Sequence, residues 1–181
     1  MNICVFGSSS AGLDAKYLEA VEAMGRAFGE RGHGLVFGGY DMGLMGAAAR
    51  GFKAGGGRVF GVVTDGLSAK GDRVLFPCDE VVSTPDLAAR KQLMMERADA
   101  FVTVPGGIGT MDELFDVLSQ AKAGESTKPC AILDVDCFYT PLVQMLDEAC
   151  AKGLNNTNWR AYCEVFTDAA ALVAYLEAQL A

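Results

Sequence analysis

Short apolar segments alternate along the whole chain with longer segments of helical periodicity, and this alternation constrains the fold more than any other feature. Glycine-bounded apolar segments separated by amphipathic helices are typical of a parallel sheet with both faces covered. The predicted strands are residues 2–7, 34–39, 58–64, a short one around 80–83, 100–104, 130–135 and 163–168. The predicted helices are residues 14–32, 42–56, 85–98, one from Gly109 onward, 140–153 and 169–180. The sequence therefore predicts an α/β fold, a Rossmann-like doubly wound parallel sheet with helices on both faces.

Two details of this prediction are less direct. The segment 65–79 is compatible with either a short helix or a loop before the short fourth strand. Pro85 is expected in the first turn of its helix, a position that proline favours. Because no repeat, low-complexity segment or linker interrupts the pattern, we expect one domain over residues 1–181.

Composition and charge exclude several classes of function. The formal net charge is −8, so the chain carries no electrostatic footprint for nucleic acid or for an anionic membrane. No apolar run approaches the roughly 20 residues that a membrane helix needs. The N-terminal residues enter a strand without a preceding basic segment, so we expect no signal peptide and a cytoplasmic location.

The cysteines and the lone histidine do not form a metal-binding pattern. The six cysteines show no CxxC spacing, and we expect them to be reduced and mostly buried. His33, the one histidine, lies in a turn, where a structural role is more common than a catalytic one. We therefore expect no metal site and no Ser–His chemistry.

Three strand-to-helix turns contain several small residues each. They are FGSSSAG (6–12), which contains Ser8 and Ser9, FGGYDMGLMG (37–46), which contains Gly39 and Gly43, and VPGGIGT (104–110). In a doubly wound sheet such turns lie at the carboxyl ends of the strands, where helix N-terminal amides can bind an anion. Taken singly, each turn is equally typical of an ordinary connection, and Ser8 and Ser9 of a helix cap. The sequence contains neither GxGxxG at the first turn nor GxxxxGK[ST], so the dinucleotide and P-loop fingerprints are absent.

Charged residues near the third turn suggest chemistry beside the anion site. Glu113 follows Thr110 by about one helical turn and should project near the phosphate-binding end, although capping is the commoner role of such a glutamate. Arg90 and Lys91 interrupt an otherwise apolar helix, which is also compatible with a solvated helix face. The planar guanidinium of Arg90 suits a phosphate or a carboxylate.

Together these motifs resemble the LOG ("Lonely guy") family of cytokinin-activating phosphoribohydrolases, whose members have often been misnamed lysine decarboxylases. The resemblance rests on Arg90-Lys91 followed by PGGxGTxxE, on FGSSSAG and GGYDMGLMG in the same order, and on KPCAILDVDCFYTPLVQML. It runs from about residue 2 to 155.

The resemblance implies a Rossmann-like homodimer with its site near the dimer interface. It implies hydrolysis of the N-glycosidic bond of an adenosine 5′-monophosphate, plain or N6-substituted, to the free base and ribose 5-phosphate, without a metal or redox cofactor. By the family motifs, Arg90 and Glu113 are the catalytic pair. The implied substrate and phosphate contacts are Ser8, Ser9, Gly39, Gly43, Lys91, Gly106, Gly107, Gly109, Thr110 and Ser119.

Three departures from the family pattern concern the base more than the reaction. Tyr40-Asp41 replaces a glycine and a small polar residue, which places a negative charge near the supposed phosphate site. Leu87 replaces a methionine, and Gln120 stands where tryptophan is common. A nucleosidase with a broader range of nucleoside 5′-monophosphates and a non-catalytic nucleotide-binding module remain as alternatives.

Overall fold

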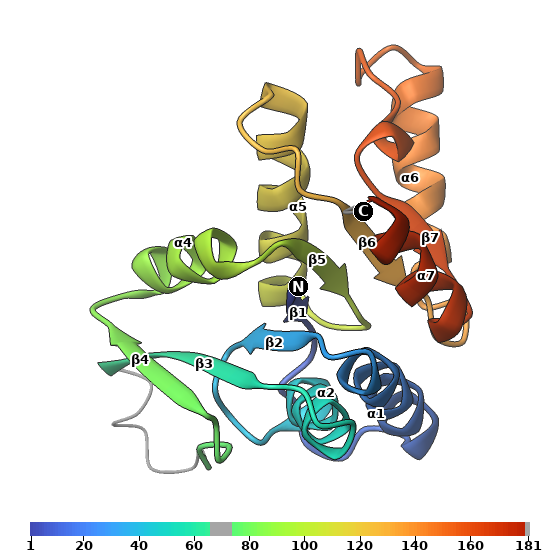
Figure 1. Cartoon of the computed structure of the whole chain (residues 1–181). Coiled ribbons are helices and arrows are strands. Elements are labelled where there is room, and N and C mark those ends of the chain that lie inside the picture. The colour runs from blue at the N-terminus through green and yellow to red at the C-terminus, as the bar shows by residue number, and fades with distance from the viewer. Residues whose placement is uncertain (66–73, 180–181) are drawn as a thin grey trace.

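The fold is a sheet of seven parallel strands between two layers of helices (Figure 1). A computed structural model describes residues 1–65 and 74–179. The strands are β1 (Asn2–Phe6), β2 (Gly34–Phe37), β3 (Val59–Thr64), β4 (Glu80–Thr84), β5 (Ala100–Thr103), β6 (Cys130–Leu133) and β7 (Glu164–Phe166). The helices are α1 (Ala15–Glu30), α2 (Gly43–Ala54), α4 (Leu87–Arg97), α5 (Ile108–Ala123), α6 (Thr140–Ala151) and α7 (Ala169–Gln179), with a 3₁₀ turn η1 (Trp159–Ala161).

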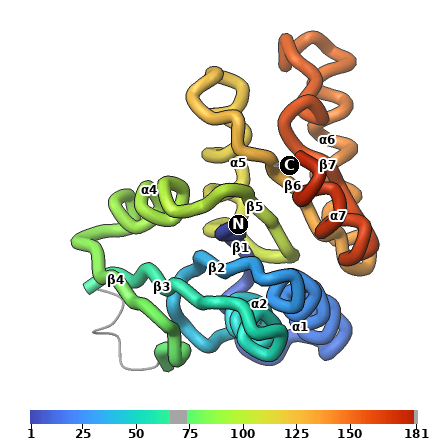
Figure 2. The backbone as a smooth tube through the Cα atoms, viewed as in Figure 1, coloured from blue at the N-terminus to red at the C-terminus, as the bar shows by residue number. Residues whose placement is uncertain are grey.

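The strand order β4-β3-β2-β1-β5-β6-β7 reverses direction between β1 and β5. Every pair in the sheet is parallel, so the carboxyl ends of all the strands lie along one edge. Figure 2 follows the chain from β1 in the middle of the sheet outward to β4, and then back through α4 to β5. In this arrangement the crevice beside β1 and β5 is the expected ligand site.

The alternation of side chains along each strand produces two separate cores. Ile3 and Val5 of β1 pack with α1, α2 and α7 on one face, whereas Cys4 and Phe6 pack with α4 and α5 on the other. Because both faces are covered, the strands read as continuous apolar segments, as parallel strands usually do. The doubly wound prediction is therefore confirmed.

Helix ends follow from a few side chains and differ slightly from the prediction. Asp86 caps α4 by accepting a hydrogen bond from the amide of Ala89 at 2.8 Å, so the helix begins at Leu87. Pro85 therefore lies before the cap, and its expected place in the first turn is wrong. The α5 helix begins at Ile108, one residue before the predicted start, with Gly107 as its N-cap.

Other predictions concern segments at the limits of the described residues. Most of the segment 65–79, predicted as helix or loop, falls on residues 66–73 and lies outside the described part, as does Leu180 at the end of the closing helix. None of the helices in the described ranges is long and apolar enough to span a bilayer. All six cysteines are free, and Cys4, Cys130 and Cys163 are buried. His33 has a structural contact, since its Nε2 lies 2.8 Å from Oε1 of Glu177.

Candidate active site at the carboxyl ends of the strands

The three small-residue turns meet at the carboxyl edge of the sheet. The amide of Ser8, after β1, donates to the carbonyl of Pro105 in the third turn at 3.1 Å. The carbonyl of Ser8 accepts from the amide of Leu44, in the first turn of α2, at 2.8 Å. The backbone of the first turn thus joins the other two, and one amide of α2 is already satisfied within the chain.

Several glycines in these turns are required by the chain itself. A Cβ at Gly38 would overlap the guanidinium of Arg90, and a Cβ at Gly106 would overlap the side chain of Thr110. Gly39 and Gly43 have φ of +82° and +51°, a region that favours glycine. A Cβ at Gly43 would also collide with the backbone at Ser8. These four glycines allow the turns and side chains to approach closely.

Gly107 and Gly109 have no such explanation inside the chain. A Cβ added at either position would meet no atom within 4 Å, and neither has a positive φ. Gly107 is the N-cap of α5 and provides no side-chain hydrogen bond to the helix. The first turn of α5 is therefore an open backbone surface at the positive end of a helix dipole, which suits close approach by an anion.

Arg90 crosses from α4 to the ends of β2 and β3. Its Nε donates to the carbonyl of Val62 at 2.8 Å, and its guanidinium passes over Gly38. Nη1 lies 4.0 Å from Oε1 of Glu113 on α5. Only 12% of the Arg90 side chain and 17% of the Glu113 side chain are exposed, so the predicted pair is largely shielded from water.

Burial raises the pKa of Glu113 from its ordinary value of 4.5 to about 7, although the charge of Arg90 acts in the opposite direction. Desolvation penalises the carboxylate more than the nearby guanidinium favours it. A carboxyl with a pKa near neutral can accept or release a proton under physiological conditions.

Lys91 faces α5 and is held between two carboxylates. Its Nζ lies 2.8 Å from Oδ2 of Asp116 and 3.0 Å from Oδ2 of Asp112. Burial favours loss of the Lys91 proton, but the two aspartates outweigh this effect and raise its pKa. Lys91 is therefore a fixed cation beside Glu113 and already has partners within the chain.

The extra negative charge of Asp41 is compensated locally. Asp41 forms an ion pair with Arg50 of α2, and its amide donates to the carbonyl of Val74 at 2.8 Å. The adjacent Tyr40 is buried. The departure at these two positions therefore contributes little free negative charge to the anion site.

Ser119 does not join the other predicted residues. The Ser119 side chain is exposed on α5, in a groove that it shares with Phe115 and with Leu146 and Trp159 beyond β6. Ser9 is partly buried, and the hydroxyl of Ser8 accepts a hydrogen bond from the amide of Ser10 at 3.1 Å. Of the predicted residues, one chain therefore brings together the glycine turn, Ser8, Arg90, Lys91 and Glu113 as a candidate site.

Sequence reasoning did not identify the support that Tyr139 gives to this turn. The Tyr139 hydroxyl donates to the carbonyl of Val104 at 2.8 Å, and its backbone amide donates to Oδ1 of Asp134 at 2.9 Å. Tyr139 is buried, and Val104 directly precedes the Pro105 turn. An aromatic residue after a strand carries no sequence signal for such a long-range contact.

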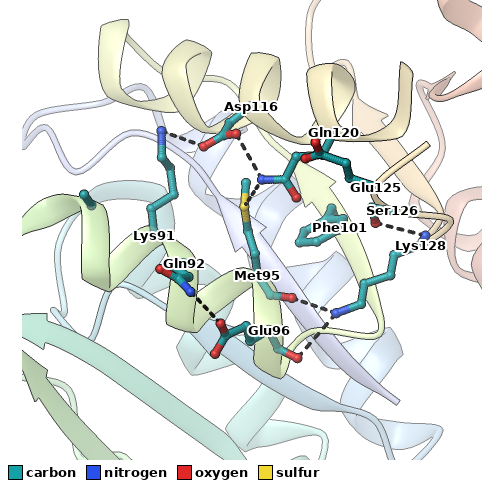
Figure 3. A pocket seen from close by; sticks show the side chains of 11 residues that line it. Lys91, Gln92, Met95, Glu96, Phe101, Asp116, Gln120, Glu125, Ser126 and Lys128 are labelled. Carbon is teal, nitrogen blue, oxygen red and sulfur yellow. Dashed lines mark hydrogen bonds and ion pairs between the residues drawn. The ribbon is translucent and has the colours of Figure 1, made fainter. Parts of the chain in front are cut away.

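A separate cavity of about 660 Å³, which shares only Lys91 with the predicted site residues, lies between α4 and α5 (Figure 3). Phe101 of β5 and Met95 of α4 lie at its inner side, and polar side chains surround them. The remaining lining residues are Ala88, Lys91, Gln92, Glu96, Asp116, Gln120, Glu125, Ser126 and Lys128. In the ranges 1–65 and 74–179, no three His, Cys, Asp or Glu side chains come together in an arrangement that could hold a metal ion.

The raised pKa of Glu113 predicts a pH-dependent stability. The folded protein keeps this proton up to about pH 7, whereas the unfolded chain releases it near pH 4.5, so stability falls as the pH rises through this interval. We expect Glu113→Gln to remove a decline of roughly 3 kcal/mol in the free energy of unfolding, since one pKa unit corresponds to about 1.4 kcal/mol. Urea denaturation at successive pH values measures the free energy of unfolding and hence this decline. Glu148→Gln, which removes an exposed carboxylate from α6, should keep the wild-type decline, and an equal decline in Glu113→Gln would contradict the assignment.

Comparison with known proteins identifies the family. The family model described as "Possible lysine decarboxylase" matches residues 45–176. The chain is 38% identical over 151 residues to the cytokinin riboside 5′-monophosphate phosphoribohydrolase LOG of Oryza sativa. The aligned region covers 83% of this chain and 62% of that protein. It is 36% identical to the cytokinin riboside 5′-monophosphate phosphoribohydrolase of Rhodococcoides fascians, over 84% of this chain and 77% of that protein. It is also 36% identical to the corresponding protein LOG7 of Arabidopsis thaliana, over 97% of this chain and 80% of that protein. The chain thus spans less than two thirds of the rice relative.

Solved structures show the same fold at lower identity. The molybdenum cofactor binding protein of Rippkaea orientalis superposes with a TM-score of 0.73 at 20% identity, covering 99% of this chain and 97% of that one. The molybdenum cofactor carrier protein of Chlamydomonas reinhardtii superposes with a TM-score of 0.72 at 23% identity, with the same coverage. At these identities the likeness concerns the fold alone. The family match and the relatives above 30% identity show that this chain belongs to the LOG family, which the matching model describes as possible lysine decarboxylases.

Proposed function

We propose that this protein hydrolyses the N-glycosidic bond of an adenosine 5′-monophosphate, plain or N6-substituted, to release the free base and ribose 5-phosphate. The observation that carries the proposal is the shielded pair of Arg90 and Glu113, 4.0 Å apart, beside an open glycine turn at a helix N-terminus. The curated relatives named above support the same reaction, since they are named phosphoribohydrolases of cytokinin riboside 5′-monophosphates.

The glycine turn would hold the 5′-phosphate. Gly106, Gly107, Gly109 and Thr110 surround the first turn of α5, where the backbone is open to a ligand at two of these positions. Phosphate binding there fixes the ribose at a set distance from Glu113, which lies about one and a half turns further along α5. Binding energy from the phosphate thus orients the reacting carbon, which does not itself touch the phosphate.

Glu113 would act on the ribose and on water. Cleavage of the C1′–N bond develops positive charge on the sugar, as in glycoside hydrolysis. The Glu113 carboxylate stabilises this charge and takes a proton from the water whose oxygen bonds to C1′. The base leaves with the bonding electron pair and takes a proton from solvent, to which Glu113 then releases its own. Arg90 keeps part of the Glu113 population ionised despite burial and positions the carboxylate.

Base release tests the reaction and the role of the pair. We expect release of base and ribose 5-phosphate from AMP or N6-isopentenyl-AMP, and a loss of at least 100-fold in kcat for Glu113→Gln, since oriented acid–base groups contribute about 10²–10⁴. Chromatography of the released base and ribose 5-phosphate measures the reaction of the wild type and the kcat of the variant. Glu148→Gln should retain wild-type kcat. Full activity of Glu113→Gln would contradict the mechanism, whereas wild-type protein that binds AMP without releasing base would favour a non-catalytic nucleotide-binding module.

The open glycines test the phosphate site separately from the chemistry. We expect Gly107→Ala and Gly109→Ala to leave the free energy of unfolding unchanged within about 1 kcal/mol, because the added methyl groups meet no atom of the chain. Their KM for AMP should rise at least tenfold, because the methyl groups obstruct the approach of the phosphate. Chemical denaturation and steady-state kinetics measure the two effects. Gly106→Ala is the matched contrast, since its methyl group overlaps Thr110 and should destabilise the fold. An unchanged KM in both open-glycine variants would place the phosphate elsewhere.

We also propose that two chains associate with the site near their interface. Ile108, within the glycine turn, is 91% exposed, and Phe115, two turns further along α5, is 38% exposed. Apolar side chains seven residues apart share one face of a helix, and a second copy would remove this face from water.

Light scattering tests the association. The wild-type protein should have the mass of two chains, and Phe115→Asp should shift it toward one chain, because burial of an unpaired carboxylate in an apolar contact is unfavourable. Leu154→Asp changes another exposed apolar side chain, beyond α6, and should remain a dimer. A wild-type mass of one chain would contradict the proposal.

A further inference from the structure

The connection from β6 to α6 contains two consecutive residues in the left-handed region of backbone conformation. Asp136 and Cys137 both have φ of +57°, and in the ranges 1–65 and 74–179 they are the only residues other than glycine with a positive φ. Side chains other than glycine rarely adopt this conformation, and such strain concentrates where the structure must hold a group in a set position. The group that this turn holds is the side chain of Tyr139, which follows it directly.

Three contacts fix the turn to its surroundings. Asp134, directly after β6, is 8% exposed, and its amide donates to the carbonyl of Phe166 in β7 at 2.7 Å. Oδ1 of Asp134 accepts from the amide of Tyr139 at 2.9 Å, which closes the two ends of the turn. Oδ2 of Asp136 lies 2.5 Å from Nζ of Lys16 on α1. The turn is therefore attached to β7, to α1 and to itself.

Tyr139 reaches from this turn to the end of the neighbouring strand β5. Its side chain is 1% exposed, and its hydroxyl donates to the carbonyl of Val104 at 2.8 Å. Burial raises the pKa of this hydroxyl and the charge of Asp134 acts in the same direction, so the hydroxyl stays protonated and remains a donor. Because the ring is buried and the hydroxyl is bound to backbone, Tyr139 acts on the end of β5 rather than on a ligand.

The backbone at the end of β5 leads directly into the glycine turn. The amide of Val104 donates to the carbonyl of Phe6 at 2.9 Å, and the carbonyl of Pro105 accepts from the amide of Ser8 at 3.1 Å. With the bond from Tyr139, both backbone polar groups of Val104 and the carbonyl of Pro105 have partners. Three hydrogen bonds thus fix the direction in which the chain enters the first turn of α5, and a side chain supplies one of them.

We propose that Tyr139 is a positioning residue of the phosphate site, whose hydroxyl fixes the entry of the glycine turn and so orients the amides of the first turn of α5 toward the 5′-phosphate. This inference rests on the proposed function and adds a residue that acts through the backbone without touching the substrate. Hydrogen bonds weaken steeply with misalignment, so a small rotation of the turn weakens phosphate binding. Arg90 and Glu113 keep their places, because Val62 holds Arg90 and the buried face of α5 holds Glu113.

The separation of KM from kcat tests this role. Tyr139→Phe removes the hydroxyl and keeps the ring, so we expect KM for AMP to rise at least about fivefold, the effect of roughly one hydrogen bond, while kcat stays within twofold. Tyr175→Phe is the matched control, since Tyr175 packs against Phe166 and lines a groove with Pro129 before β6; it should keep both values. A fall in kcat as large as the rise in KM would assign Tyr139 a general structural role and overturn the inference.

Equilibrium binding separates this inference from the proposed reaction. Ribose 5-phosphate, which carries the phosphate but no base, is titrated into the wild type and both variants by calorimetry. Its Kd should rise in Tyr139→Phe by the same factor as KM for AMP and should stay unchanged in Tyr175→Phe. Wild-type protein that binds ribose 5-phosphate but releases no base from AMP would overturn the reaction alone. An unchanged Kd in Tyr139→Phe would overturn the role of Tyr139, and no binding by the wild type would overturn both.

A second variant tests the turn that carries the hydroxyl. Asp134→Ala keeps the hydroxyl but removes the acceptor of the Tyr139 amide, so the Kd for ribose 5-phosphate should rise here too. The double variant should bind no more weakly than the weaker single variant, because both changes act through the same contact. Fully multiplied effects would contradict this connection. If Tyr139→Phe does not fold, the Kd of Asp134→Ala decides, and an unchanged value would overturn the inference.

Discussion

The guanidinium of Arg90 imposes the geometry on which the rest of the site depends. A charge that is only 12% exposed needs close partners, and Arg90 finds them in the Val62 carbonyl and the Glu113 carboxylate. To reach both, it must pass over the end of β2, where only glycine at position 38 leaves room. This one side chain thus requires glycine at position 38 and connects α4 with β3 and α5.

The same placement determines the protonation of Glu113. Burial favours the neutral acid and Arg90 favours the carboxylate, while the smaller effects of Asp112 and Lys91 oppose each other, and the pKa of Glu113 is about 7. The raised pKa of Glu113 lowers the stability of the fold toward neutral pH, and it leaves the carboxyl available both protonated and ionised. This combination is typical of acid–base groups in enzymes.

The sequence predicts the sheet and most of the site because both depend on local pattern. Strand and helix alternation and glycine at strand ends place the glycine turn, Arg90 and Glu113 at one edge. Contacts between distant segments carry no such pattern, as shown by the hydrogen bond from the Tyr139 hydroxyl to the Val104 carbonyl. The expected position of Pro85 is wrong because Asp86 caps α4 instead. Within one chain Ser119 lines another groove of α5, and its predicted contact with a ligand stays a prediction.

Glycine alone would not have distinguished a ligand site from tight packing. Gly38 and Gly106 are explained by neighbouring side chains, and Gly39 and Gly43 by their backbone angles. Only at Gly107 and Gly109 does the chain leave the missing side chain unexplained, and both lie at the helix end nearest to Glu113. An open helix N-terminus favours an anion, so the proposed phosphate site lies where packing within the chain does not require glycine.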